Sequence, residues 1–226
     1  MQVQDDVTRI EQKIQNGYTI SIESCISGGW NLFRKNPGPF ILYGLLAGVI
    51  LFFLGLIPIA GAIASYLVGP ALYAGVYLGA RKIDTEGSAE LNDFFKGFDH
   101  VVQLFLYSLI SGILISIATV LLIIPGIWLA VAVTLAMPMI VFAKTDFWES
   151  IKMSVKLVNK NWFQFFALWI IIILLNFVGV IFLFVGLLVT IPVTFCILYV
   201  AYKEVVGFSS GEGQINIEDH LVDDSN

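Results

Sequence analysis

Four side chains of this sequence have the types that acid–base chemistry uses; three lie outside its longest apolar stretches and the fourth lies at the edge of one. They are Asp93, Asp99, His100 and Glu149. Carboxylates and imidazoles act as general acids and bases when they reach one substrate together. An enzyme working at a membrane surface is therefore one hypothesis, and it requires these side chains to converge in one pocket.

The other signatures of catalysis are missing. The chain has two cysteines, Cys25 and Cys196, and two histidines, and no pair has the spacing of metal ligands. It contains no HExxH, P-loop, GxSxG or kinase motif. Both thiols are expected to be free, since Cys25 is expected in the reducing cytoplasm and Cys196 within the last membrane helix. We expect no catalytic residue, cofactor or metal site.

Three segments carry no Asp, Glu, Lys or Arg: Asn36–Ala80, His100–Ala143 and Asn161–Tyr202, of 45, 44 and 42 residues. One membrane helix needs about 20 apolar residues. Each segment therefore predicts two crossings joined by a tight turn. The fold class is all-α, a polytopic membrane protein with six transmembrane helices as three hairpins. The helices are expected at about 40–60, 62–81, 101–124, 126–143, 163–183 and 186–205.

The lack of charge inside these segments limits the function. Ion-coupled transporters and aspartyl intramembrane proteases keep ionisable groups within the membrane, although such groups are costly there. Neither class fits this chain. The polar residue that stands out is Asn176 in the fifth helix, whose amide must find a partner in lipid. An interhelical hydrogen bond and a role in lining a ligand path are the two alternatives.

A proline interrupts the second helix of each hairpin. Each removes one backbone donor and leaves a carbonyl without its partner four residues earlier, at Tyr66, Thr134 and Leu188. The kinked helices either frame a central cavity or are tolerated as packing kinks. The candidate cavity or packing positions are Asn176, Tyr66, Thr134, Pro70, Pro138 and Pro192.

Small residues spaced four apart predict close helix contacts, either within one chain or between chains. They form three series: Ala71, Gly75 and Gly79; Ser108, Gly112 and Ser116; and Gly44 with Gly48.

All 12 Lys and Arg residues fall before, between or after the three hairpins, so they share one side of the membrane. The positive-inside rule places that side in the cytoplasm, with both termini, and the protein in the inner membrane as a multi-pass chain. Residues 1–17 are expected to form a cytoplasmic amphipathic segment, 18–206 the membrane domain and 207–226 an acidic disordered tail that supplies the net charge of −5.

A short segment with helical periodicity precedes each hairpin and is expected to lie flat in the headgroup region and orient the hairpin that follows. In the third, Lys152, Lys156 and Lys160 recur every fourth residue and could contact lipid headgroups. The first and third units match at an offset of 125 residues: Ile26, Leu32, Lys35, Asn36 and Phe40 correspond to Ile151, Leu157, Lys160, Asn161 and Phe165. We interpret the domain as three copies of a unit of about 60 residues.

Several local patterns look familiar: Gly29-Trp30-Asn31-Leu32-Phe33 with Lys35-Asn36, Phe94-Phe95-Lys96-Gly97-Phe98, Pro125-Gly126-Ile127-Trp128, Trp148-Glu149-Ser150 with Ser154, and Gly186-Leu187-Leu188-Val189-Thr190-Ile191-Pro192. Over residues 18–207 the chain resembles uncharacterised prokaryotic six-helix membrane proteins, which are similar to the membrane domain fused to some bacterial glycerophosphodiester phosphodiesterases. The resemblance implies a six-helix fold. It transfers no functional residue and no phosphodiesterase activity, since no catalytic domain follows.

Two functions remain besides the surface enzyme. The first is a non-enzymatic membrane scaffold, lipid-interacting module or assembly subunit. The second is a facilitator or permease for a neutral or amphipathic solute, through a cavity between the proline-kinked helices. The expected partners are the lipid bilayer and, beyond it, other membrane proteins or further copies of the chain; no nucleic acid is expected.

Overall fold

The computed structural model describes residues 2–182 and 185–208, and the acidic tail expected at 207–226 falls almost wholly outside them. The described chain is all-α. Its elements are α1 (Gln2–Asn16), α2 (Ile22–Lys35), α3 (Pro37–Gly55), α4 (Ala60–Glu86), α5 (Leu91–Phe95), η1 (Lys96–His100), α6 (Val101–Leu121), α7 (Ile123–Ala132), α8 (Ala136–Phe142), α9 (Phe147–Val158), η2 (Asn159–Asn161), α10 (Trp162–Ile181) and α11 (Leu187–Val205).

Within the described residues, six helical segments are long and apolar enough to cross a membrane, which confirms the all-α polytopic fold. They form three hairpins: α3 with α4, α6 with α7 and α8, and α10 with α11. The fourth segment differs from the prediction because it is two helices, α7 and α8, separated at residues 133–135.

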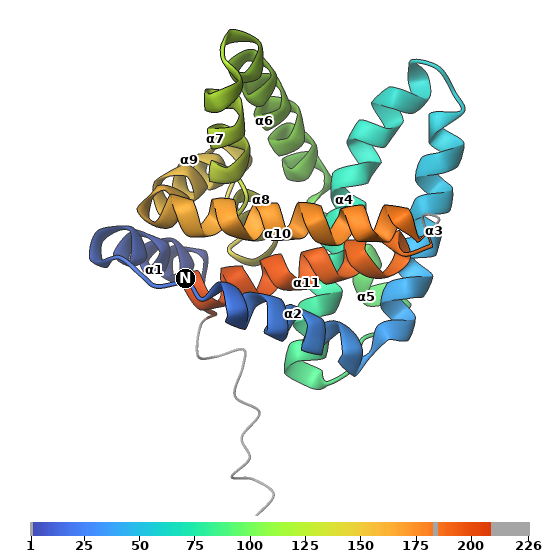
Figure 1. The fold of residues 1–226 in the computed structure, drawn as a ribbon, viewed down its shortest axis with the longest axis horizontal. Helices are drawn as coiled ribbons and strands as arrows, with labels where there is room; N and C mark the ends of the chain where they lie inside the picture. The colour runs from blue at the N-terminus through green and yellow to red at the C-terminus, as the bar shows by residue number, and fades with distance from the viewer. Residues whose placement is uncertain (1, 183–184, 209–226) are drawn as a thin grey trace, which may run out of the picture.

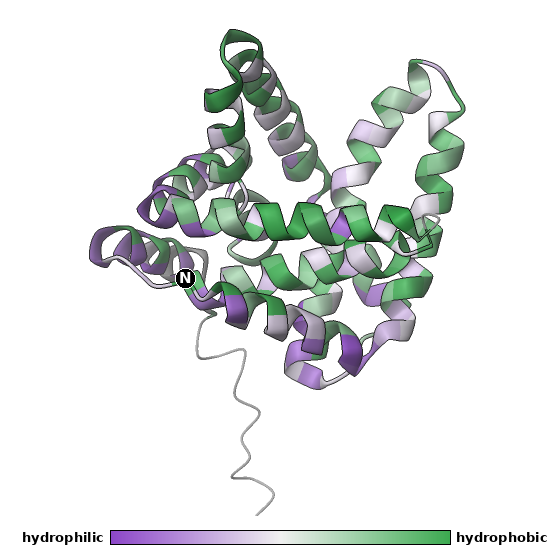
Figure 2. Ribbon diagram, in the orientation of Figure 1, coloured by the Kyte–Doolittle hydropathy of each residue, from purple (hydrophilic) through white to green (hydrophobic). Residues whose placement is uncertain are grey.

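Figure 1 shows the hairpins α3/α4 and α6/α7 rising from a shared region and diverging, while α10 and α11 run across in front of them. In Figure 1, α1, α2 and α5 lie on the side of α10 away from the two rising tips, and α9 lies at the lower end of the α6/α7 hairpin; we call the region of these four short helices the base. Hydrophilic residues gather at the base, and the rising hairpins are largely hydrophobic (Figure 2). Side chains at the tips are strongly exposed, with Ile59 at 80% and Ile124 at 80%.

The short helices α2, α5 and α9 each pack on a hairpin other than the one that they were expected to orient. The α5–η1 segment lies against α4, and α9 lies against α7 and α8. α2, which comes before the first hairpin in the chain, lies along α11 of the third hairpin. A Cβ atom at Gly29 would come within 2.6 Å of the Ile197 backbone nitrogen, so the absence of a side chain permits this approach.

A serine of α9 bridges the broken fourth segment. Ser154 is fully buried, and its hydroxyl donates to the Ala132 carbonyl at 2.8 Å and accepts from the Leu135 amide at 3.1 Å. Ala132 is the last residue of α7, and Leu135 directly precedes α8. Because buried backbone groups must be paired, the serine supplies hydrogen bonds that the interrupted helix cannot make.

The predicted close contacts at the small-residue series are found at Gly75 but not at Gly44 and Gly48. A Cβ at Gly75 would collide with the α5 backbone and with the Tyr43 hydroxyl, which confirms a close contact. A Cβ at Gly48 would meet nothing within 4 Å, and one at Gly44 only the Pro192 ring at 4.0 Å. Gly44 and Gly48 therefore make no close helix contact within the chain and border open space instead, so for this pair a contact between chains stays a prediction.

Candidate functional site

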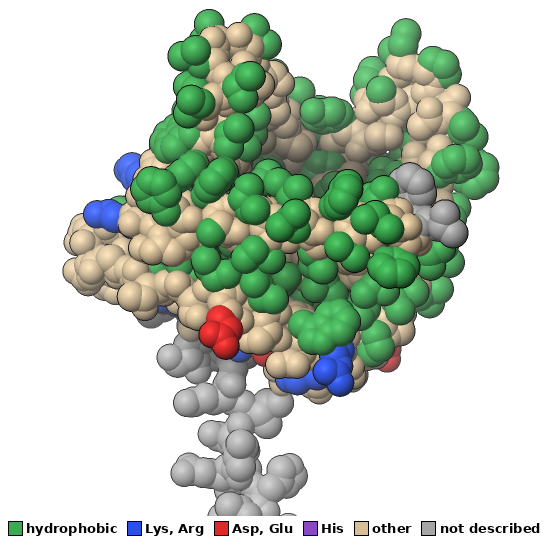
Figure 3. Space-filling view, in the orientation of Figure 1, with side chains coloured by type: hydrophobic (Ala, Val, Ile, Leu, Met, Phe, Trp, Pro, Cys, Tyr) green, Lys and Arg blue, Asp and Glu red, His purple; other side chains and the backbone are tan. Residues whose placement is uncertain are grey.

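A groove of about 410 Å³ lies where the three hairpins meet. Its walls come from α4, α6, α7, α8, α10 and α11 and from the break between α7 and α8. Figure 3 shows the molecule hollowed between the two rising hairpins, with hydrophobic side chains around the hollow. We call this the inter-hairpin groove and define it by six of its larger or polar lining residues: Tyr73, Tyr77, Tyr107, Thr134, Trp169 and Phe195.

The polar groups in the groove wall are largely satisfied by the wall itself. The Trp169 indole N–H donates to the Thr134 hydroxyl at 2.8 Å, and that hydroxyl donates to the Val131 carbonyl at 2.7 Å. The Tyr107 hydroxyl donates to the Val133 carbonyl at 3.3 Å. Because these donors are already engaged, the groove offers an occupant mainly apolar and aromatic surface.

Asn176 makes a contact between helices. Its amide nitrogen donates to the Thr194 hydroxyl at 2.8 Å and to the Ile172 carbonyl at 2.9 Å, joining α10 to α11. The amide oxygen is buried without a hydrogen-bond partner among the described residues. Thr194 also lines the groove, so Asn176 stands behind the groove wall.

The three prolines are buried but do not surround one cavity. Pro192 borders a separate apolar cavity of about 260 Å³ between α3, α4 and α11, which Gly44 and Gly48 also line. Pro70 and Pro138 line neither this cavity nor the groove. Tyr66 is 52% exposed, and a Cβ at Gly112 of α6 would lie 3.2 Å from its hydroxyl. Of the six predicted positions, only Thr134 lines the groove.

The side chains predicted for a surface enzyme do not meet in one pocket. Asp93 accepts hydrogen bonds from the ammonium groups of Lys82 and Lys96, at 3.0 and 2.9 Å. Glu149 lies 3.7 Å from Lys152 of its own helix. Only Asp99 and His100 share a cavity. The requirement of that hypothesis is not met.

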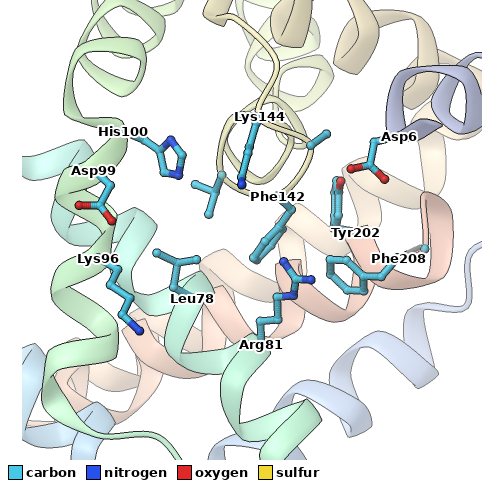
Figure 4. Close-up of a pocket in the computed structure, with 13 residues that line it drawn as sticks. Asp6, Leu78, Arg81, Lys96, Asp99, His100, Phe142, Lys144, Tyr202 and Phe208 are labelled. Atoms are coloured by element: carbon cyan, nitrogen blue, oxygen red, sulfur yellow. The ribbon is translucent and has the colours of Figure 1, made fainter. Parts of the chain in front are cut away.

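Asp99 and His100 line a cavity of about 240 Å³ at the base, which we call the basic pocket. Its ionisable lining residues are Asp6, Arg81, Lys96, Asp99, His100 and Lys144. Figure 4 shows these side chains around the hollow, contributed by α1, α4, η1 and the loop after α8. The guanidinium of Arg81 lies over the rings of Phe142 and Phe208, 5.4 and 4.7 Å from their centroids.

The predicted headgroup lysines are exposed on one flank of α9 and η2, and Lys152 lies near Glu149. Cys25 and Cys196 are both free and buried. Burial, together with the neighbouring Glu204 carboxylate, raises the pKa of the Cys25 thiol to about 12. A thiol with that pKa is protonated at neutral pH and is a poor nucleophile.

Sequence reasoning did not identify the residues of the inter-hairpin groove or of the basic pocket. The groove depends on Trp169, Tyr107 and Phe195, which read as ordinary membrane residues. The basic pocket gathers Arg81 and Lys96 from the region between the first and second hairpins and Lys144 from the connection between the second and third. One signal for the basic pocket was present in the sequence. Each of the three cations lies at or near the end of a charge-free segment, and the ends of the hairpins on one side of the membrane can come together.

Comparisons of the chain with protein families, with curated proteins and with solved structures give no match. The fold by itself defines the class, an all-α polytopic membrane protein.

Proposed function

We propose that the chain is a non-enzymatic, lipid-interacting membrane module whose inter-hairpin groove receives the acyl chain of an amphipathic lipid. The observation that carries this proposal is the groove: apolar and aromatic, formed by all three hairpins and about 410 Å³ in volume. Pockets for small molecules span roughly 300–1,000 Å³ and are mainly apolar.

Apolar burial alone gives such a groove little selectivity. An acyl chain that leaves the bilayer exchanges one apolar environment for another, so the hydrophobic gain is small. Selection then depends on shape and on the polar end of the ligand. The base carries the ionisable groups suited to that second role.

We also infer that the membrane domain consists of three copies of one unit, arranged in a ring. Ser154 follows Gly29 at the same offset of 125 residues, and both contact the second helix of the preceding hairpin. The correspondence extends to Asn36 and Asn161. Their amides donate to the carbonyls of Ala89 and Tyr18, each in the connection leading into the next unit's short helix.

In this proposal the short helices are amphipathic interfacial helices, and the base faces the cytoplasm with both termini, in the inner membrane. The support is the distribution of Lys and Arg along the chain. The partners are bilayer lipid and, for an assembly role, other membrane proteins or further copies. The resemblance to the phosphodiesterase-linked membrane domain stays a prediction.

The groove is tested by filling it. Ala130 lines the groove and is half-buried, whereas Ala62 of α4 is exposed and lines none of the cavities described above. The full chain is purified from membranes, and its co-purifying lipid is counted by native mass spectrometry. We expect Ala130→Phe to lose retained lipid and Ala62→Phe to keep it. Equal retention in both variants would refute the proposal.

A facilitator for an amphipathic solute is the second candidate, and one observation favours it. The groove and the basic pocket follow each other along the same helices: Tyr77 and Leu198 line the groove, and Leu78 and Tyr202 line the pocket. Tyr77 and Phe142 stand between them, with ring centroids 6.4 Å apart. Solute flux into proteoliposomes should increase in Tyr77→Ala. If neither the wild type nor Tyr77→Ala transports the solute, the groove and the basic pocket do not form a transport path.

A further inference from the structure

We propose that the basic pocket is a binding site for a phosphate group, carried either by a lipid headgroup or by a free phosphate anion. Among the described residues, three basic and two acidic side chains line it, and these leave one excess positive charge before His100 is counted. The inference stands on this pocket and does not depend on what occupies the groove.

Arg81 provides a fixed cationic surface. Its guanidinium is held over two aromatic rings, Phe142 and Phe208, which are themselves in contact at 5.4 Å between centroids. Stacking of this kind orders the guanidinium plane before a ligand arrives, and the planar fork matches the oxygens of a phosphate. Less conformational freedom is then lost on binding.

Lys144 is held in an unusual backbone conformation at the rim. Its φ is +51°, in the left-handed region that non-glycine residues seldom adopt. Its ammonium group makes no ion pair with any described residue. Figure 4 shows the side chain extending from the loop after α8 into the hollow. Strain that persists at a ligand-sized hollow points to a functional placement of this amine.

Two of the other charged lining residues, Lys96 and Asp6, have partners that keep them in place. Lys96 donates to Asp93 at 2.9 Å, and Asp6 accepts from Arg9 at 2.6 Å. Each of these pairs joins a pocket residue to one outside it, so neither neutralises Lys144. A phosphate, with one to two negative charges, would match the excess positive charge of the lining.

The experiment uses the full chain in phosphatidylcholine nanodiscs with two probes. Inorganic phosphate binding is measured by calorimetry, and retention of phosphatidic acid mixed into the nanodisc lipid is measured by native mass spectrometry. The variants are Lys144→Gln and Lys144→Gly, the second of which fits the positive φ and cannot fail through backbone strain. The matched control is Lys160→Gln, an exposed lysine outside the pocket.

We expect both Lys144 variants to weaken binding of at least one probe by about tenfold, the size of one charge-assisted contact, while Lys160→Gln stays within about twofold of the wild type. Loss for phosphatidic acid alone identifies a lipid headgroup as the source, and loss for both probes identifies the phosphate itself. No binding of either probe, or equal weakening in Lys160→Gln, would overturn the proposal. The groove variant Ala130→Phe separates the two proposals, because its binding of inorganic phosphate should match the wild type.

Discussion

Ser154 is the side chain on which the fourth membrane segment most visibly depends. A single hydroxyl pairs a carbonyl and an amide at a helix break, in a fully buried setting. A helix interrupted within the membrane is tolerated where neighbouring groups satisfy the freed backbone. The serine comes from α9, the short helix that precedes the third hairpin.

We expect Ser154→Ala to lower the free energy of unfolding by about 1–3 kcal/mol, because it leaves a buried donor and a buried acceptor unpaired. Ser88→Ala is the matched control, since Ser88 is exposed between the first two hairpins and should change stability by less than about 0.5 kcal/mol. Denaturant titration in mixed micelles measures both. Equal stability of the two variants would show that the hydroxyl is not needed at the break.

Part of this arrangement could be predicted from the sequence. Pro138 predicts a disturbed helix because it lacks an amide donor, and the disturbance is found a few residues before it, at 133–135. The partner that restores the hydrogen bonds could not be inferred, since Ser154 is one of two serines in its segment and nothing in the pattern indicates which helix it meets. The interaction of Asn176 was easier to predict, because a side-chain amide in lipid needs a hydrogen-bond partner. Its amide nitrogen donates to the Thr194 hydroxyl on the neighbouring helix.

At the level of elements, the short helices act as connections between hairpins. α2 lies along α11, which joins the beginning of the chain to its last membrane helix. Glu204 of α11 reinforces this contact by accepting from the Ser21 amide at 3.3 Å and lying 3.7 Å from the Cys25 sulfur. Periodicity predicts that α2 has an apolar face, but it does not say which helix that face meets.

Two adjacent glycines of α2 allow this contact to be tested. A Cβ at Gly29 would lie 2.6 Å from backbone of α11, whereas one at Gly28 would lie 3.2 Å from a methyl group of Val200, which can rotate away. We expect Gly29→Ala to destabilise the fold by about 1–3 kcal/mol through overpacking. Gly28→Ala should be neutral or slightly stabilising, because alanine favours the helix. Thermal unfolding of the two variants in detergent compares them; a stable Gly29→Ala would mean that α2 does not pack this closely.

At the scale of the whole molecule, the lengths of the three charge-free segments predicted six membrane helices, because each crossing of a bilayer requires about 20 apolar residues. The turns were placed to within a few residues: the first falls between Gly55 and Ala60 and the second at Leu122. The relative directions of the hairpins could not be inferred, since they follow from contacts such as Gly29 with Ile197 and Gly97 with Gly75, far apart in the sequence. The groove and the basic pocket are products of those directions.

The central claim, that three hairpins share one polar base, is tested most directly by cysteine accessibility in intact membrane vesicles. The background lacks Cys25 and Cys196, and single cysteines replace Ser88 and Lys160 at the base and Leu122 at a tip. Leu122 is 67% exposed, and the other two are exposed in the connections between hairpins. A membrane-impermeant maleimide should label Ser88→Cys and Lys160→Cys from the same side and Leu122→Cys from the other. Labelling of Ser88→Cys and Lys160→Cys from opposite sides would contradict the three-hairpin arrangement.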